Sequence, residues 1–297
     1  MPRPPSPRRA VLEVLASASL FGTTGTSASF APATASTTAI GAARLVVGGI
    51  GLFVALPFLG GVRAQVLRLL RTPVGSVAAF STALYQVTFF AAVARTGVAI
   101  GTLVAIGSGP VLAGLISWVL LGERPTAAWW ASTAICIAGL GLLGAEGIGN
   151  ADGDLAGIAL ALGAGASFAA YTVSAKRLMV RGAASAEAMA TAFGGGAVLS
   201  LPVLILAGAA WLAEPRGASV VLWLGLATVS FAYVLFGRGL RALPAGPVAT
   251  LVLAEPLVAT ILGVIVLDEP LAATSWIGAA LVAIGLCLEA VIASSRH

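Results

Sequence analysis

Two charged residues lie well inside long apolar stretches of the chain, where a charge is costly and therefore informative. They are Arg44 and Glu255. Either costs about 3 kcal/mol or more if it faces lipid, so such residues face a protein interior or a water-filled cavity. From the rise per residue, the Cα depths of the two differ by only about 5 Å within a hydrocarbon core about 30 Å thick.

Three interpretations of Arg44 and Glu255 are open from the sequence. The two could form a structural ion pair that holds two parts of the protein in register, because charges inside a membrane usually pair with one another. Arg44 could instead bind the carboxylate of a substrate. Glu255 could be a titratable group that takes up and releases protons, since carboxylates at this depth serve as proton relays.

A proline lies near the middle of two of the apolar stretches. Pro110 is the thirteenth residue of 98–120 and Pro256 the twelfth of 245–266. Each removes a backbone hydrogen bond near the middle of its helix, and the freed carbonyl needs a partner from protein or cavity water because lipid offers none. We expect the two prolines to form part of a cavity wall; the alternative is a kink that only shapes packing.

Uncharged polar residues in the same stretches could complete a pocket. Serine and threonine often bond their own helix backbone, whereas the amide of Gln86 needs partners in apolar surroundings. Further polar candidates are Thr26, Ser27 and Ser230. The predicted substrate-binding residues are Thr23, Thr24, Arg44, Tyr85, Gln86, Pro110, Tyr171, Tyr233, Glu255 and Pro256.

The elements that must position these residues are ten apolar stretches. Hydrophobic residues make up 59% of the chain and charged residues 9%, and the mean hydropathy is +1.04. An ordinary soluble chain is roughly half apolar and a quarter charged, so a soluble domain is excluded. At about 1.5 Å per residue each stretch can cross a membrane. The stretches are 14–31, 37–58, 74–94, 98–120, 127–145, 155–175, 187–207, 219–237, 245–266 and 273–293.

The basic residues predict the orientation. If the N-terminus is cytoplasmic, thirteen of the 16 Lys and Arg residues fall on the cytoplasmic side, and only Arg95 and Arg216 fall outside. This asymmetry places both termini in the cytoplasm. It also accounts for the net charge of +5 without a nucleic-acid partner.

Other residue types predict structure more than chemistry. Cys136 and Cys287 lie in apolar stretches and the only histidine is His297, so we expect no metal, disulfide or cofactor. We expect close helix contacts at Gly48, Gly49, Gly51, Gly139, Gly141, Gly144 and Gly194–Gly196, and membrane-interface anchors at Trp129, Trp130, Trp211 and Trp276.

The chain contains an internal repeat. Adding 146 positions takes Pro110 to Pro256 and Glu123 to Glu269, with Trp130 and Gly139 matching Trp276 and Gly285. Each half has five stretches, an odd number, so the second half enters the membrane from the opposite side. We therefore predict an all-α membrane protein of two inverted five-helix repeats, 1–149 and 150–297, with Asp154 as the N-cap of the sixth helix.

These paired segments resemble the EamA family of the drug/metabolite transporter superfamily. The resemblance rests on Gly107–Pro110 through Leu121–Arg124, on Leu253–Pro256 through Leu267–Glu269, and on Tyr85–Gln86 with the Ser/Thr/Gly-rich first helix. It covers essentially the whole chain. Pro270 departs from the family pattern, which leaves the role of the turn at Glu269 open. The family implies a fold and a transport function, and says little about the substrate.

The sequence therefore predicts a secondary transporter of the bacterial plasma membrane, present as a monomer or homodimer. The resemblance implies export of a small amphipathic metabolite such as an amino acid, with protons as a candidate coupling ion. Efflux of drugs or toxic compounds and a passive channel are the alternatives. An integral-membrane enzyme is disfavoured, because the spans and short loops carry no nucleophile with a base, no acidic metal cluster and no phosphate-binding loop.

Overall fold

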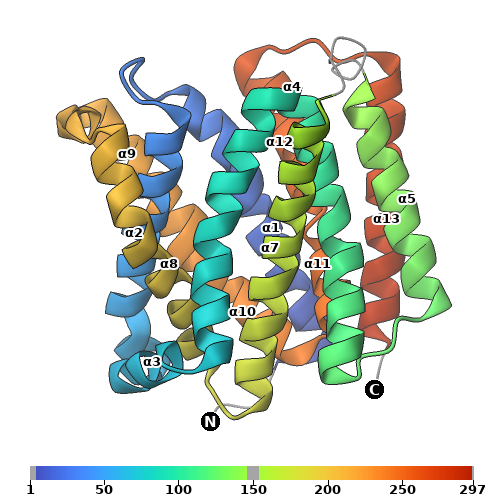
Figure 1. The fold of residues 1–297 in the computed structure, drawn as a ribbon. Coiled ribbons are helices and arrows are strands. Elements are labelled where there is room, and N and C mark those ends of the chain that lie inside the picture. Colours follow the sequence, from blue (N-terminus) through green and yellow to red (C-terminus); the bar gives the residue numbers. More distant parts are fainter. Residues whose placement is uncertain (1–4, 146–153, 296–297) are drawn as a thin grey trace.

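The computed structural model describes residues 5–145 and 154–295, and within these ranges the regular elements are all helices. The helices run side by side as one bundle, with the start of α1 and the end of α13 at the same end (Figure 1). We call this end the base and the opposite end the mouth. The predicted boundary between the repeats, at 149 and 150, lies outside the described residues.

In chain order the first half contains α1 (Pro7–Ser29), α2 (Thr37–Ala55) with a short 3-10 turn (Leu56–Leu59), α3 (Arg63–Leu70), α4 (Pro73–Leu121) and α5 (Ala127–Leu143). The second half contains α7 (Leu155–Val180), α8 (Ser185–Ala207), a 3-10 turn (Ala210–Ala213), α9 (Pro215–Leu222), a π-helical segment (Trp223–Phe231), α10 (Ala232–Ala242), α11 (Ala245–Leu251), α12 (Ala254–Leu267) and α13 (Ala273–Ser294). Asp154 caps α7 as predicted, accepting the backbone N–H groups of Ala156 and Gly157.

Within the described residues, eight helical segments are long and apolar enough to span a membrane. They begin at Thr37, Pro73, Ala99, Leu155, Ser185, Pro215, Ala245 and Ala273. Of the two other predicted spans, α5 is apolar but has only 17 residues. α1 is 23 residues long but begins with Arg8, Arg9 and Glu13 and is rich in Ser, Thr and Gly, which lowers its hydropathy. The chain is thus a multi-pass membrane protein, and the count of ten spans remains a prediction.

Among the described residues, one helix break lies close to Pro256 and another lies away from Pro110. α4 turns at Gly97 (φ 79°, ψ 165°), a backbone conformation that favours glycine. The span from Ala245 is broken at Val252–Leu253, directly before Glu255 and Pro256, and this break divides α11 from α12. Pro110 lies inside a helix that continues through it. In the first half the break therefore lies at Gly97, away from Pro110.

Contacts between the two halves follow a matched pattern. α5 packs against α13, and α2 packs against α8. α1 packs against α10 and α12, while the corresponding helix of the second half, α7, packs against both parts of α4. Each main helix contact made by the first half therefore has a counterpart made by the corresponding helices of the second half.

At the α5–α13 crossing the two backbones approach closely. A methyl group on Gly139 would lie 2.7 Å from the carbonyl oxygen of Gly278, and one on Gly278 would lie 2.6 Å from the carbonyl oxygen of Gly139. Gly285 approaches Ser132 and Cys136 in the same way. The predicted glycine contact is confirmed here, although Gly141 has open space around it.

The tryptophan prediction is half right. Trp130 and Trp276 are 41% and 56% exposed, as interface anchors should be. Trp129 and Trp211 are 1% and 3% exposed, so they belong to the protein interior. Trp129 donates its indole N–H to the hydroxyl of Thr250 at 3.0 Å, which satisfies its polar atom inside the bundle.

Candidate functional site: a central cavity closed at the base

A cavity of about 570 Å³ runs from the middle of the bundle to the mouth. Its deep end is lined by Arg44, Tyr85, Gln86 and Glu255. Ala28, Thr37, Leu143 and Gly144, at the mouth ends of α1, α2 and α5, line its opening. Between the two ends the wall is mainly apolar and aromatic, formed by Ile40, Phe89, Phe90, Leu103, Ile106 and Leu140.

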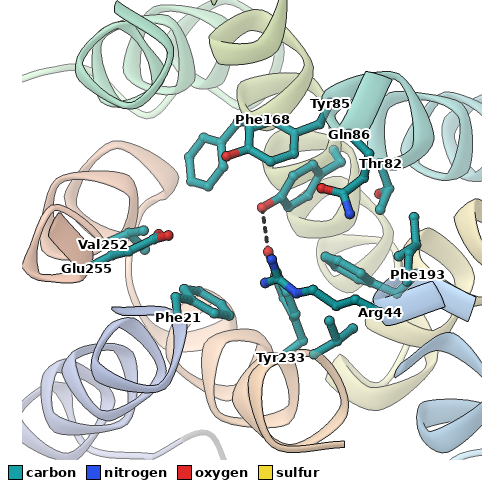
Figure 2. Close-up of a pocket in the computed structure, with 13 residues that line it drawn as sticks. Phe21, Arg44, Thr82, Tyr85, Gln86, Phe168, Phe193, Tyr233, Val252 and Glu255 are labelled. Carbon is teal, nitrogen blue, oxygen red and sulfur yellow. Dashed lines mark hydrogen bonds between the residues drawn. The ribbon is translucent and has the colours of Figure 1, made fainter. Parts of the chain in front are cut away.

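A smaller chamber of about 50 Å³ continues from the deep end toward the base. Figure 2 shows Glu255 on one side of it and Arg44 on the other, with the Glu255 carboxylate directed into the opening and Tyr85 and Gln86 along a third side. The ion pairs found among the described residues do not include Arg44 or Glu255. The structural ion pair between these residues is therefore not formed in this conformation, because they occupy opposite walls.

The local structure explains why these side chains meet the cavity. Arg44 lies one turn before Gly48 and Gly49, whose missing side chains let α2 approach α8 and the π-helical segment closely. Glu255 lies in the first turn of α12, directly after the helix break. The Gln86 amide donates to the carbonyl of Gly41 at 2.9 Å, which fixes α4 against α2.

Two polar atoms at the deep end have no hydrogen-bond partner among the described residues. They are Nε of Arg44 and the hydroxyl of Thr24, and both atoms are buried. A buried donor without a partner costs about 1 to 3 kcal/mol. Both residues line the large cavity, so a bound polar ligand or water could satisfy these atoms.

Aromatic side chains separate the chamber from the base. Tyr171 and Tyr233 share a hydrogen bond of 3.0 Å between their hydroxyls. The Tyr233 ring lies 4.8 Å from that of Phe21, 3.7 Å from that of Phe193 and 5.5 Å from that of Phe236. We call Phe21, Tyr171, Phe193, Tyr233 and Phe236 the aromatic barrier. All five are at most 8% exposed, and all but Phe236 also line the chamber.

A polar network lies nearer the base. The carboxylate of Glu123 accepts the Ser117 hydroxyl and the backbone N–H of Ala245, the latter at 2.8 Å. The ammonium of Lys176 donates to the carbonyls of Leu240 and Leu243 at 2.7 and 2.8 Å and lies 3.8 Å from Glu123. We call these residues the base lock. The lock joins the end of α4, in the first half of the chain, to α7 and the α10–α11 connection, in the second half.

Most of the predicted substrate-binding residues meet at this site. Thr24, Arg44, Tyr85, Gln86, Glu255 and Pro256 line the large cavity, and Tyr171 and Tyr233 line the chamber.

Two predicted residues lie in the wall of neither cavity. The Thr23 hydroxyl donates to the Leu20 carbonyl and accepts the Trp223 indole N–H. Pro110 is buried inside the continuous part of α4. Thr23 fails as a cavity residue because adjacent helix positions point in different directions, so Thr24 faces the cavity and Thr23 does not. Ser230 likewise bonds the Gly48 carbonyl.

Sequence reasoning missed several cavity residues that it could have found by helical spacing. Phe21 precedes Thr24 by three positions, Thr82 precedes Tyr85 by three, and Phe89 follows Tyr85 by four, so each shares a helix face with a predicted residue. Nothing in the sequence indicated that Lys176 and Glu123 meet, and only the fold brings them together.

No group of three or more His, Cys, Asp or Glu side chains that could hold a metal ion occurs among the described residues. A membrane-embedded bundle with a polar-ended cavity open at one end is the architecture of a multi-pass membrane transporter.

Comparison with known proteins gives the family. The EamA-like transporter family matches the chain twice, over residues 8–145 and 155–290, and the chain belongs to this family. It is 41% identical over 275 residues to "Uncharacterized transporter YwfM" of Bacillus subtilis (strain 168), covering 93% of this chain and 91% of that protein. A 67-residue match, 36% identical, covers 23% of this chain and 86% of the permease-like protein YdzE of the same organism.

A solved crystal structure of a protein 24% identical in sequence aligns with a TM-score of 0.80, covering 96% of this chain and 97% of the other. At this level of identity the likeness concerns the fold. The family and the relatives identify a transporter rather than an enzyme.

Proposed function

We propose that the protein is a secondary transporter for a small amphipathic zwitterion, such as an amino acid with a large apolar side chain. The observation that carries this proposal is the placement of Arg44 and Glu255 on opposite walls of one cavity without an ion pair between them. A ligand with a carboxylate and an ammonium group can satisfy both walls. Hydrogen bonds to charged groups contribute about 1.5 to 3 kcal/mol each, so both contacts favour a zwitterion over a singly charged analogue.

The rest of the cavity supports an apolar substrate side chain. Phe89, Phe90, Ile40 and Leu140 line the wall between the charged end and the mouth. The volume of about 570 Å³ lies in the usual range for small-molecule sites, about 300 to 1,000 Å³. The substrate would therefore lie with its charged end deep and its apolar part toward the mouth.

The closure at the base supports alternating access. The cavity opens at the mouth, while the aromatic barrier and the base lock close the other end. For release and reloading the base must open as the mouth closes, and the matched contacts of the two halves support two inverted five-helix repeats that exchange roles. This arrangement includes α1 and α5 among ten spanning helices.

The distribution of basic residues supports a cytoplasmic base in a bacterial plasma membrane. Arg63, Arg68, Arg71, Arg124 and Arg181 lie in connections at the base, whereas Arg95 and Arg216 lie at the mouth. Cytoplasmic loops carry the excess of Lys and Arg, so both termini are cytoplasmic. In this orientation the structure is open to the outside, and export proceeds through a state open at the base.

Glu255 also supports protons as the coupling ion. It is the carboxylate of the cavity wall and no cation lies within ion-pair distance of it among the described residues. The same carboxylate can alternately hold a proton and the ammonium group of the substrate, which would couple the two movements.

The test is counterflow into proteoliposomes with radiolabelled phenylalanine as the probe. The competitors are unlabelled phenylalanine, phenylalanine amide, which lacks the carboxylate, and N-acetylphenylalanine, which lacks the ammonium group. Phenylalanine should compete at least about tenfold more strongly than either analogue. Equal competition by all three would contradict the zwitterion site and favour efflux of apolar compounds. Uptake that shows no counterflow would indicate a passive channel.

A further inference from the structure

The connection between α2 and α4 carries three arginines and several exposed apolar side chains. The arginines are Arg63, Arg68 and Arg71, and the chain has no acidic residue between Glu13 and Glu123. α3 lies across the base of the bundle beside α2 (Figure 1). Phe58 is 88% exposed, Val62 57% and Leu67 54%, so apolar and cationic groups are exposed on the same short segment.

Contacts with the rest of the bundle hold this segment in place. The Glu187 carboxylate accepts the backbone N–H of Val62 at 3.0 Å, and Val66 is buried to 1% exposure in the main core. Arg63 donates to the carbonyls of Phe53 and Val54, both at 3.3 Å, at the end of α2. Arg68 and Arg71 differ from Arg63, because no described residue forms an ion pair or side-chain hydrogen bond with either and both are exposed.

The other half of the chain provides an internal comparison. Its corresponding connection, between α8 and α9, lies at the mouth. There the charges are tied to the protein: Arg216 donates to the Phe30 carbonyl at 2.6 Å, and Glu214 accepts the Thr34 hydroxyl at 3.3 Å. Trp211 is buried there, in contrast to Phe58. The element at the base therefore leaves Phe58, Arg68 and Arg71 exposed, whereas Trp211 is buried and Glu214 and Arg216 are hydrogen-bonded in its counterpart.

We propose that α3 with Phe58, Arg68 and Arg71 is a binding site for an anionic phospholipid of the membrane leaflet at the base. The guanidinium groups would contact the headgroup phosphate, and Phe58, Val62 and Leu67 would contact the upper part of the acyl chains. Exposed apolar side chains beside cations are the arrangement of an interfacial helix, and each cation near an anionic surface strengthens binding by about fivefold. The bound lipid would fix the connection between the two helices that carry Arg44 and Gln86.

The experiment measures lipid selectivity at α3 directly. In a Cys287→Ser background, Ala64→Cys is labelled with bimane and the protein is reconstituted in phosphatidylcholine vesicles. Nitroxide-labelled phosphatidylglycerol or nitroxide-labelled phosphatidylcholine is then added in increasing mole fraction. Half-quenching should need about 25-fold less of the anionic lipid, about fivefold for each of the two arginines, and this ratio should fall at high salt.

Variants separate this site from general membrane effects. The double variant Arg68→Gln/Arg71→Gln should bring the ratio close to one, and Arg68→Lys/Arg71→Lys should keep most of the selectivity. Arg124→Gln, at an exposed cation of the base outside α3, should leave the ratio unchanged. A label at Ala209→Cys, in the counterpart connection, should show a ratio near one. Equal quenching by the two lipids in the parent protein, or undiminished selectivity in the double glutamine variant, would overturn the proposal.

Discussion

Removal of the Lys176 ammonium should open the base of the transporter. Lys176→Met deletes the donors to the Leu240 and Leu243 carbonyls and the charge that lies 3.8 Å from Glu123. The Coulomb attraction at this distance is about 4 kcal/mol at an effective dielectric constant of 20, and desolvation of the ammonium offsets part of it. Removing one partner of a buried pair costs about 3 to 5 kcal/mol.

We expect the lower end of that range, because Glu123 keeps the Ser117 hydroxyl and the Ala245 N–H as donors. If the lock forms only in the conformation closed at the base, the loss of about 3 kcal/mol shifts the equilibrium toward the open base about 150-fold. Glu123→Gln, which can still accept the Ala245 N–H, should shift the equilibrium less.

Cysteine accessibility can measure this shift. Ala249 lies one turn into α11 from the lock and is 1% exposed, so Ala249→Cys in a Cys287→Ser background should react slowly with a membrane-impermeant maleimide. Adding Lys176→Met should raise the labelling rate by about two orders of magnitude, in proportion to the open population.

Arg177→Met is the matched control, because Arg177 is the next residue of α7 and takes no part in the lock. It should leave the labelling rate of Ala249→Cys unchanged. If Lys176→Met and the parent label equally fast while both keep similar melting temperatures, the lock does not govern closure of the base.

Three further predictions follow from the packing and the charges. Gly139→Ala places a methyl group against the α13 backbone and should destabilise the protein by about 1 to 3 kcal/mol, whereas Gly141→Ala, in open space, should leave the melting temperature in detergent unchanged or slightly raised; equal effects would contradict the close crossing. Pro256→Ala should reduce counterflow more than Pro110→Ala, because Pro256 lines the cavity beside a helix break and Pro110 does not. Equal losses in the two variants would contradict this difference and support a symmetric role of the two prolines. The hydrogen bond from Arg95 lowers the pKa of Asp154 in the folded protein. This pair therefore stabilises the fold above the unfolded pKa of Asp154, and the stabilisation is lost as the pH falls through the folded pKa. Acid should lower the melting temperature of the parent more than that of Asp154→Asn, and an equal dependence of both melting temperatures on pH would argue against this contribution.

The sequence was sufficient to predict the depth of the important residues. Helical rise gives the height of each residue in the membrane, so Arg44 and Glu255 were expected within about 5 Å of the same depth, and the structure brings them to one cavity. The glycine contact at Gly139 also follows from local pattern, since small residues let helix backbones approach.

The direction of each side chain around the bundle axis could not be obtained in this way. Arg44 and Glu255 share a level but occupy opposite walls, which depends on how α2 and α12 pack. Repeat symmetry was misleading for Pro110. The helix continues through Pro110, whereas the matching Pro256 lies just after a helix break. The base lock could not be predicted from the sequence either, because Lys176 donates to carbonyls more than 60 positions away in the chain.

The central claim is that Arg44 binds the carboxylate of the substrate and Glu255 its ammonium group. The most direct test removes each wall charge and each substrate charge in turn. Counterflow of radiolabelled phenylalanine is measured in the parent, Arg44→Gln and Glu255→Gln, each with phenylalanine, its amide and its N-acetyl derivative as competitors. Without the Arg44 charge the carboxylate loses its partner, so the amide should compete as well as phenylalanine in Arg44→Gln. For the same reason the N-acetyl derivative should match phenylalanine in Glu255→Gln. Uniform weakening of all three competitors in both variants would contradict the assignment of one substrate charge to each wall.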